Sequence, residues 1–369
     1  MRIAQVAPLY ESVPPKLYGG TERVVSFLTE ELVRQGHDVT LFASGDSRTS
    51  AQLVATSPAA LRLAGGGDPV ARHLCMLDEV FRRAHDFDVI HFHTEYLHFP
   101  YGSRLDVPRV TTMHGRMDLP DLAPVLRRFP REPLVSISDA QRSPVPFANW
   151  IGTVHHGLPD GRLRFQPERG RYLAFLGRIC PEKRPDRAIE IAVRTGLPLK
   201  IAAKVDRADR DYFEREIEPM LDHPLVSLVG EIGDDRKAEF LGGALALLFP
   251  IDWPEPFGLV MIESMACGTP VIAFARGAVP EVMRDGVSGY VVSTVEGAVE
   301  AVRDLGRLDR TKVRRYFESR FSVTRMADAY QAIYARLAGY RAGMSKGRSA
   351  PANSPGPVRE RLGSGQTVS

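Results

Sequence analysis

One stretch in the second half of the chain decides the fold, and it reads Trp253-Pro254-Glu255-Pro256-Phe257-Gly258-Leu259-Val260-Met261-Ile262-Glu263-Ser264. The two prolines hold Glu255 in an extended loop, and Gly258 opens a helix. Glu263 lies within that otherwise apolar helix, about 8 Å along from Gly258 at a rise of about 1.5 Å per residue. The two carboxylates are too far apart to share one proton. They predict a grip on two ends of an extended ligand whose anionic middle lies at the helix N-terminus. The alternative is a structural Glu263 bonded to a neighbouring turn.

On both sides of this stretch, short apolar runs alternate with amphipathic segments, which predicts an α/β fold with parallel sheets. A linker over residues 157–171 separates two such series. The predicted strands are 2–7, 39–43, 89–93, 110–113, 134–138 and 152–155, then 172–177, 199–203, 226–229, 245–249, 270–273 and 289–292. The predicted helices are 21–35, closed by Gly36, and 69–83, 184–194, 208–220, 234–242, 258–266, 294–305, 311–317 and 323–342.

Length and composition favour two soluble domains. The chain has 369 residues, of which 44% are hydrophobic and 25% charged. No apolar run reaches the about 20 residues of a membrane span, and the N-terminus lacks the apolar region of a secretory signal. The three cysteines are far apart, which predicts reduced thiols in a cytoplasmic protein. Residues 341–369 contribute +4 to a formal net charge of +3, so the body carries −1 and gives no reason to expect nucleic acid as a partner.

Residues 16–22, Lys-Leu-Tyr-Gly-Gly-Thr-Glu, connect the first predicted strand to the first helix. Gly19 and Gly20 let backbone N–H groups approach an anion at the helix N-terminus. The alternative is a surface turn with Thr21 as the N-cap. The Gly-x-Gly-x-x-Gly fingerprint is absent, which disfavours a nicotinamide or flavin dinucleotide.

Residues 175–184 end a predicted strand in a cationic loop. Gly177 ends the strand, so Arg178 and Lys183 stand at the carboxyl edge of the sheet. Two cations there suit a diphosphate, arginine as a planar fork and lysine as a point charge. The alternatives are solvated loop charges or pairing of either cation with Glu182.

The histidines of the first half gather at strand ends. His91 and His93 face the same side of a strand, but no third ligand has convincing spacing, so we predict no metal site. His114 ends a strand just before Gly115 and is expected to point into the cleft between the domains. Two acidic pairs are predicted to be helix caps or solvated faces, not metal ligands: Asp206 with Asp209, and Asp234 with Asp235.

Taken together, these motifs resemble a known family. Residues 255–273 look like the signature of family 4 of the retaining nucleotide-sugar glycosyltransferases, and residues 277–282 and 285–290 resemble the segment that follows it. The resemblance covers roughly residues 1–340 and implies a GT-B fold, in which two Rossmann-like domains face a central cleft. It divides the chain into an acceptor domain (1–160), a nucleotide-sugar donor domain (161–322) and a helix crossing back to the first domain (323–342). The Gly, Ser, Pro and Arg that dominate the remaining residues predict a disordered tail (343–369).

The resemblance assigns the catalytic positions. The cations matching Arg178 and Lys183 hold the donor diphosphate. The glutamate matching Glu263 takes the ribose hydroxyls, whereas Glu255 lies by the donor sugar. The histidine matching His114 sits beside the reacting sugar.

Further donor-binding positions follow from the same resemblance. Backbone N–H groups of Phe257, Gly258 and Leu259 line the sugar and phosphate, and the Gly19-Gly20 pair closes over the diphosphate. One departure concerns Lys204, which stands where the family usually has glycines beside the nucleotide. This lysine either adds a donor contact or fills the space.

The function implied by the resemblance is transfer of a hexosyl group from a nucleoside-diphosphate sugar to a hydroxyl acceptor in glycan biosynthesis. The anomeric configuration is retained, and neither metal nor cofactor is needed. A sugar-nucleotide epimerase of the same fold and a catalytically silent nucleotide-sugar-binding protein are the alternatives. A solvated C-terminal tail is favoured over peripheral membrane contact because its cations are sparse.

Overall fold

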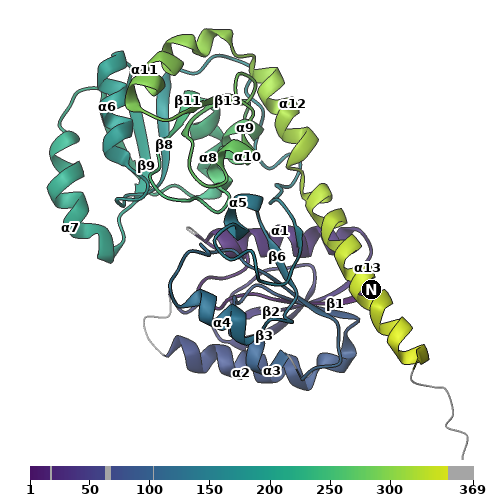
Figure 1. Cartoon of the computed structure of the whole chain (residues 1–369). Helices are drawn as coiled ribbons and strands as arrows, with labels where there is room; N and C mark the ends of the chain where they lie inside the picture. The colour runs from purple at the N-terminus through teal and green to yellow at the C-terminus, as the bar shows by residue number, and fades with distance from the viewer. Residues whose placement is uncertain (17–18, 63–67, 103, 348–369) are drawn as a thin grey trace, which may run out of the picture.

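The computed structural model describes residues 1–16, 19–62, 68–102 and 104–347, with side chains described to residue 339. The chain forms two lobes, each built on one parallel sheet, and two helices run down one side of the molecule from the second lobe to the first (Figure 1). The predicted α/β class and pair of parallel sheets are confirmed.

The first lobe holds a seven-stranded sheet in the order β3-β2-β1-β4-β5-β6-β7. Its strands are β1 (Arg2–Val6), β2 (Asp38–Ser44), β3 (Gln52–Ser57), β4 (Val89–Phe92), β5 (Arg109–Thr112), β6 (Leu134–Ser136) and β7 (Trp150–Thr153). Its helices are α1 (Gly20–Arg34), α2 (Pro69–Arg82), η1 (Ala84–Asp86), α3 (Phe99–Gly102), α4 (Leu122–Arg128) and α5 (Asp139–Arg142). The strand order reverses between β1 and β4, and ligands of open parallel sheets bind beyond the carboxyl ends at such a point.

The second lobe holds a six-stranded sheet in the order β10-β9-β8-β11-β12-β13, which reverses between β8 and β11. Its strands are β8 (Tyr172–Arg178), β9 (Leu199–Lys204), β10 (Val226–Gly230), β11 (Ala244–Phe249), β12 (Val271–Phe274) and β13 (Gly289–Val292). Its helices are α6 (Pro185–Thr195), α8 (Asp234–Gly242), α9 (Leu259–Ala266), α10 (Val279–Val282), α11 (Val295–Arg303), η5 (Asp304–Arg307) and α12 (Arg310–Arg320).

The structure differs from the sequence analysis in three details. Strand β3 was not predicted. The helix expected over 208–220 is present as one uninterrupted helical stretch, but its pitch changes along it, through η2 (Arg207–Asp209), α7 (Arg210–Tyr212), the π-helical η3 (Phe213–Ile217) and η4 (Glu218–Met220), which contains Pro219. Helix α1 begins at Gly20 with Gly19 as its N-cap residue, so Thr21 is not the cap.

Helix α13 (Val323–Gly347) returns from the second lobe and packs on α1 and β4 of the first. It extends beyond residue 342, so the prediction of a disordered tail from residue 343 is wrong for 343–347; residues 348–369 lie outside the described part of the chain. The predicted domain boundary at 160/161 falls in the connection between β7 and β8. We propose that connection as the boundary.

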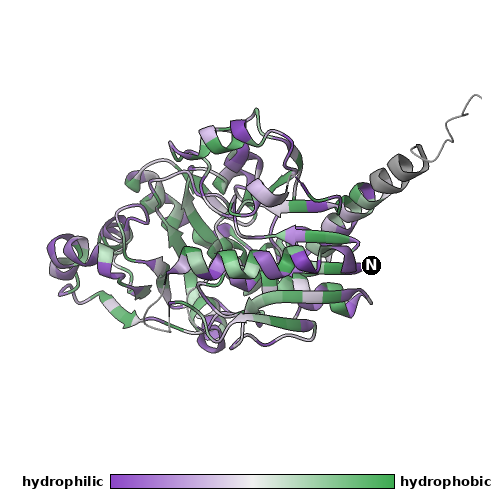
Figure 2. Ribbon diagram, turned by 90° about the horizontal axis from the view of Figure 1, so that it is seen from below, coloured by the Kyte–Doolittle hydropathy of each residue, from purple (hydrophilic) through white to green (hydrophobic). Residues whose placement is uncertain are grey.

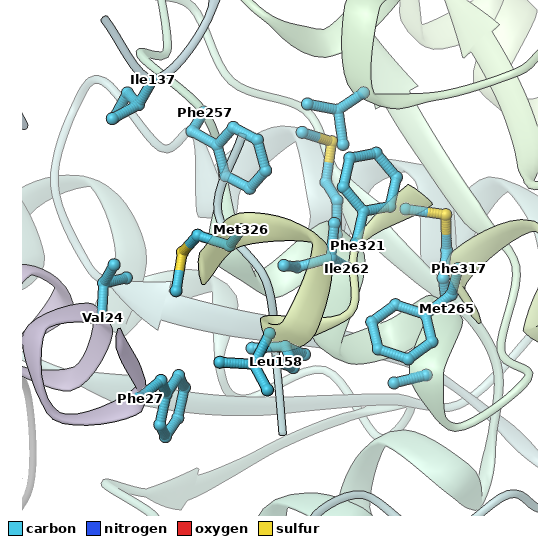
Figure 3. Packing of buried hydrophobic residues seen from close by; sticks show 14 of the residues in the cluster. Val24, Phe27, Ile137, Leu158, Phe257, Ile262, Met265, Phe317, Phe321 and Met326 are labelled. Atoms are coloured by element: carbon cyan, nitrogen blue, oxygen red, sulfur yellow. The ribbon is translucent and has the colours of Figure 1, made fainter. Parts of the chain in front are cut away.

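The buried apolar residues hold the two lobes together as well as each sheet. Strands in the interior are largely hydrophobic, whereas helices alternate hydrophilic and hydrophobic residues along their length (Figure 2). One cluster joins Val24 and Phe27 of α1 to Leu158 of the connection, Met326 of α13 and Phe257 beside α9 (Figure 3). Because this cluster is shared, the lobes are packed against each other behind the cleft.

Candidate functional site

A cavity of about 670 Å³ lies at the carboxyl ends of both sheets and is lined from both lobes. This volume is within the usual range for a small-molecule site, about 300–1,000 Å³. It is lined by every residue that the sequence predicted for the site: Gly19, Gly20, His114, Arg178, Lys183, Glu255, Phe257, Gly258, Leu259 and Glu263. The structure thus brings together positions that are up to 244 residues apart in the chain.

The loop that carries Glu255 has a closely fitted backbone. Gly277, at φ +53°, lies so near this loop that an added Cβ would stand 2.3 Å from the backbone N and O of Glu255. The backbone N–H of Ala278 donates to the Glu255 carbonyl at 2.9 Å. Gly258, at φ +84°, then turns the chain into α9. Residues 254–258 therefore depend on glycine at two places for their shape.

Lys183 and Glu255 form an ion pair in the cavity wall. Their side chains are 16% and 10% exposed. The Trp253 indole N–H donates to the same carboxylate oxygen at 3.0 Å, and the lysine Nζ lies 4.8 Å from the centre of the Trp253 ring. The alternative in which Lys183 is a solvated loop charge is therefore wrong. A ligand anion that bound Lys183 would share it with Glu255.

Arg178 is also held by carboxylates. It lies 3.5 Å from Asp206, 3.4 Å from Asp209 and 3.8 Å from Glu182. The predicted alternative pairing with Glu182 is present, but Asp206 and Asp209, expected to be caps or solvated, are also partners. Lys204 lines the cavity and pairs with Asp206 at 2.8 Å. These carboxylates balance the charges of Arg178 and Lys204 and hold the two side chains at the ends of β8 and β9.

Glu263 has a cationic partner that the sequence did not reveal. Lys237 of α8 donates to its carboxylate at 2.7 Å and lies 3.4 Å from Asp234. Arg23 of the first lobe and Arg162 of the connection also contact Asp234. Asp234 is therefore an ion-pair partner between the lobes and not only a first-turn residue. The contact of Glu263 is thus with a side chain of another helix and not with the neighbouring turn that was the predicted alternative.

The His114 ring lines the cavity and is fixed from behind by hydrogen bonds. Its Nε2 lies 2.8 Å from His93 Nδ1, and His93 Nε2 lies 2.8 Å from the Gln5 side-chain oxygen. The Gln5 amide reaches the Tyr334 hydroxyl of α13 at 3.2 Å. Burial lowers the pKa of His114 to about 3, so the ring is neutral at physiological pH.

His91 belongs to the same network rather than to a metal site. Its Nδ1 lies 2.7 Å from the Tyr334 hydroxyl, and its Nε2 lies 2.7 Å from the Thr112 hydroxyl. Burial lowers its pKa well below the usual value, so it is neutral. Within the described residues, no group of three or more His, Cys, Asp or Glu side chains is arranged to hold a metal ion.

The two lobes meet directly beside the cavity. The Ser138 hydroxyl donates to the Pro256 carbonyl at 2.6 Å. The Glu281 carboxylate accepts from the backbone N–H groups of Asp139 and Ala140, at 2.9 and 3.2 Å, and lies 2.6 Å from His155 Nε2. Burial acts to raise the pKa of Glu281, but these hydrogen bonds outweigh it and hold that pKa below its ordinary value. Glu281 is therefore a charged residue of the second lobe that is hydrogen-bonded to the first lobe across the cleft.

Several cavity residues were missed by the sequence analysis: Glu22, Arg23, Arg62, Glu95 and Lys237. Glu22 lies two residues after the glycine pair, within a motif that the sequence already marked. Glu95 could not be singled out from the sequence. Its unusual feature is a positive φ of 51° at a non-glycine residue, which only a structure shows. The others are ordinary charges in the sequence, and their role appears only through long-range pairing.

Comparison with known proteins agrees with this architecture. The family described as Glycosyltransferase Family 4 matches residues 18–181, and the family described as Glycosyl transferases group 1 matches residues 164–320. The chain therefore belongs to the glycosyltransferases of this family 4 and group 1 type. The resemblance drawn from residues 255–273 is confirmed.

Similar curated proteins carry the name D-inositol 3-phosphate glycosyltransferase. The one from Salinispora arenicola is 36% identical over 155 residues, which are 38% of this chain and 34% of that protein. The one from Mycolicibacterium vanbaalenii is 26% identical over 336 residues, 74% of each chain. The chain thus spans about a third of the length of several of the curated relatives that it matches.

Solved structures show the same GT-B fold, as predicted. AviGT4, a glycosyltransferase involved in avilamycin A biosynthesis, matches with TM-score 0.73 and 24% identity over 92% of this chain and 98% of that chain. Sucrose-phosphate synthase from Thermosynechococcus elongatus matches with TM-score 0.76 and 17% identity over 92% and 99%. HepE of Anabaena, solved in complex with UDP-glucose, matches with TM-score 0.67 and 16% identity over 93% and 100%. Within the described part of this chain, no helix has the length and hydrophobicity needed to cross a bilayer.

Proposed function

We propose that the chain transfers a hexosyl group from a nucleoside-diphosphate sugar to a hydroxyl acceptor with retention of the anomeric configuration. The observation that carries this proposal is the cavity wall of the second lobe. There Arg178, Lys183 and Lys237 stand beside Glu255 and Glu263 at the carboxyl end of one sheet. One wall of the cavity therefore offers both cations that can bind a diphosphate and carboxylates that can accept hydrogen bonds from hydroxyls. The structures with bound UDP and UDP-glucose support a nucleotide-sugar ligand for this fold.

In the proposed reaction, the bond between the sugar C1 and the diphosphate oxygen breaks, and a bond from C1 to the acceptor oxygen forms on the same face. The acceptor proton goes to the leaving phosphate oxygen. The residues contribute by placing the two substrates and by stabilising negative charge that develops on the phosphate. Arg178 and Lys183 provide the positive charge that stabilises the phosphate, and Glu255 aligns Lys183 and meets the sugar.

His114 is proposed to pack beside the reacting sugar as a neutral ring. Its single hydrogen bond to His93 fixes the ring orientation, and its burial keeps it uncharged. Neutrality matters because an imidazolium at this point would repel developing positive charge on the sugar. No metal or cofactor is part of the proposed reaction, and cytoplasmic action is proposed on the basis of the sequence alone.

The test is a transfer assay with a nucleotide sugar of known anomeric configuration, followed by proton NMR of the product. Retention requires the product to have the anomeric configuration of the donor. Glu255→Gln is expected to lower transfer while binding of the bare nucleoside diphosphate is preserved. An inverted product contradicts the mechanism. Conversion of the donor without an acceptor instead indicates an epimerase, and nucleotide binding without turnover indicates a silent binding protein.

A further inference from the structure

The part of the cavity lined by the first lobe differs in charge from the part lined by the second. We call it the first-lobe wall, and its polar and aromatic side chains at the cavity are chiefly Tyr10, Glu22, Arg62, Glu95, Tyr96 and Arg116. If the donor binds to the second lobe, as proposed above, this wall is what the acceptor touches.

The cations of the first-lobe wall are neutralised by carboxylates of the protein. Arg62 pairs with Glu11 at 2.9 Å. Arg116 pairs with Asp118 at 2.6 Å and with Glu182 at 3.2 Å. Arg23 is almost fully buried and contacts Asp234. Residues 17, 18 and 63–67, which fall outside the described ranges, contain no lysine or arginine in the sequence.

Two carboxylates of the same wall are supported chiefly by backbone N–H groups. Glu95 Oε1 accepts from the backbone N–H groups of His114 and Gly115, each at 3.1 Å. Glu22 is 5% exposed, and backbone N–H groups of Glu22 and Glu11 stabilise its charge; the repulsion of the Glu11 carboxylate opposes this and the attraction of Arg62 adds to it. Among the residues that the structure describes, neither carboxylate forms an ion pair. Burial raises the pKa of both, which shows that negative charge at these places is poorly compensated.

An anionic acceptor group would face the carboxylates of Glu22 and Glu95. The arginines of this wall would attract it little, because protein carboxylates already pair with them. Repulsion between like charges is strong in a partly dehydrated cavity. Hydroxyl groups, in contrast, donate hydrogen bonds to carboxylates and gain from their charge. At the rim, Tyr10 and Tyr96 are 46% and 43% exposed and offer aromatic faces to the apolar C–H face of a ring.

We propose that the acceptor is a neutral polyhydroxylated ring, a sugar or cyclitol without a phosphate or carboxylate, whose hydroxyls donate to Glu22 and Glu95. This assignment rests on the proposed transfer function and adds to it the class of acceptor. It makes Glu22 and Glu95 residues that determine acceptor specificity. It also gives Glu11 a role, because that carboxylate occupies the Arg62 guanidinium that would otherwise attract an anion.

The test compares neutral and phosphorylated members of two acceptor pairs, glucose with glucose 6-phosphate and myo-inositol with inositol 1-phosphate. Calorimetry with nucleoside diphosphates first identifies the nucleotide that binds, and the matching nucleotide sugar serves as donor. The wild type is expected to use a neutral member with at least about tenfold higher kcat/KM than its phosphate. Preference for a phosphorylated member, or use of neither member of either pair, overturns the neutral-acceptor assignment.

Three variants test the residues themselves. Glu22→Gln is expected to lower kcat/KM for the neutral acceptor by about five- to tenfold, because a charge-assisted hydrogen bond becomes a neutral one. Glu11→Gln, which releases Arg62, is expected to raise relative use of the phosphorylated member by a similar factor. Glu168→Gln, an exposed position outside the cavity lining, is the matched control.

Nucleotide affinity separates failure of this assignment from failure of the proposed function. All three variants are expected to bind the nucleoside diphosphate as the wild type does, which also shows that they are folded. A Glu22→Gln variant indistinguishable from Glu168→Gln in acceptor use overturns the role of Glu22. Failure of the wild type to bind any nucleoside diphosphate contradicts the proposed transfer function itself.

Discussion

Replacing Lys183 by methionine tests whether its pair with Glu255 organises the cavity before any ligand binds. The methionine keeps an apolar chain against Trp253 but leaves a buried carboxylate with only the indole N–H at 3.0 Å. Removing one partner of a buried pair costs about 3–5 kcal/mol. Because the pair lines an open cavity, we take the lower value of about 3 kcal/mol. At an unfolding entropy of about 2.1 cal/mol/K per residue, a chain of 369 residues shifts by about 1.3 °C per kcal/mol, so the melting temperature should fall by roughly 4 °C.

A double-mutant cycle gives the matched control. Glu255→Gln keeps a hydrogen-bond acceptor for Trp253 and removes the charge that Lys183 balances. The double variant Lys183→Met/Glu255→Gln should be more stable than the sum of the single losses predicts, by at least about 1 kcal/mol. Thermal and urea unfolding of the four proteins measure this coupling. Losses that add within about 0.5 kcal/mol would refute the idea that the two residues act as a pair.

Three further predictions concern the histidine network, the hydrogen bonds of Glu281 between the lobes, and the loop that carries Glu255. Tyr334→Phe removes a buried hydroxyl that meets His91 and should destabilise the protein by about 1–3 kcal/mol in urea unfolding; an unchanged midpoint contradicts it. Because the pKa of Glu281 is lowered in the folded protein, its contribution to stability is complete above the ordinary carboxyl pKa of 4.5 and is lost as the pH falls through the lower folded value. Glu281→Gln should therefore make stability fall less steeply at acidic pH. A stability–pH profile parallel to that of the wild type refutes this. Gly277→Ala places a Cβ 2.3 Å from the backbone of Glu255 and should lower both the melting temperature and nucleotide affinity, whereas Gly306→Ala, with no atom within 4 Å, should not; equal effects contradict the fitted loop.

The sequence was sufficient for the architecture because the buried strands have continuous apolar character. All six strands of the second sheet were predicted, whereas β3 of the first was missed. The reason is its position at the sheet edge, where Gln52–Ser57 is half exposed and its apolar residues do not alternate clearly. The helix expected at 208–220 is present, but its changes of pitch, with Pro219 in the last segment, could not be predicted from its composition.

The sequence was sufficient to predict which residues line the site, but not which charged side chains pair with one another. Motif spacing placed Arg178, Lys183, Glu255 and Glu263 at one sheet edge, and all four line the cavity. Their partners could not be inferred because each pair joins different segments. Lys183 and Glu255 are 72 residues apart, and Lys237 lies on a helix that no site motif indicated.

The histidine network illustrates the same limit over a longer range. The sequence placed His91 and His93 on one side of a strand, and their ring centres do lie 4.0 Å apart. Their hydrogen-bond partners include Tyr334, 243 residues from His91. Only the return of α13 to the first lobe, which the family resemblance implied, brings that hydroxyl to the strand. The chemistry of the pair thus depends on tertiary packing.

Thermal stabilisation by nucleoside diphosphates tests the central claim most directly. It is measured on the wild type, on Arg178→Ala and on Arg194→Ala, an arginine of the same lobe outside the cavity lining. A ligand at 100 times its dissociation constant adds about 2.7 kcal/mol. The account predicts stabilisation of the wild type and Arg194→Ala by a selected nucleotide, with affinity about ten- to a hundredfold weaker in Arg178→Ala. No stabilisation of the wild type by any nucleoside diphosphate, or equal stabilisation of all three proteins, would contradict a donor site at Arg178.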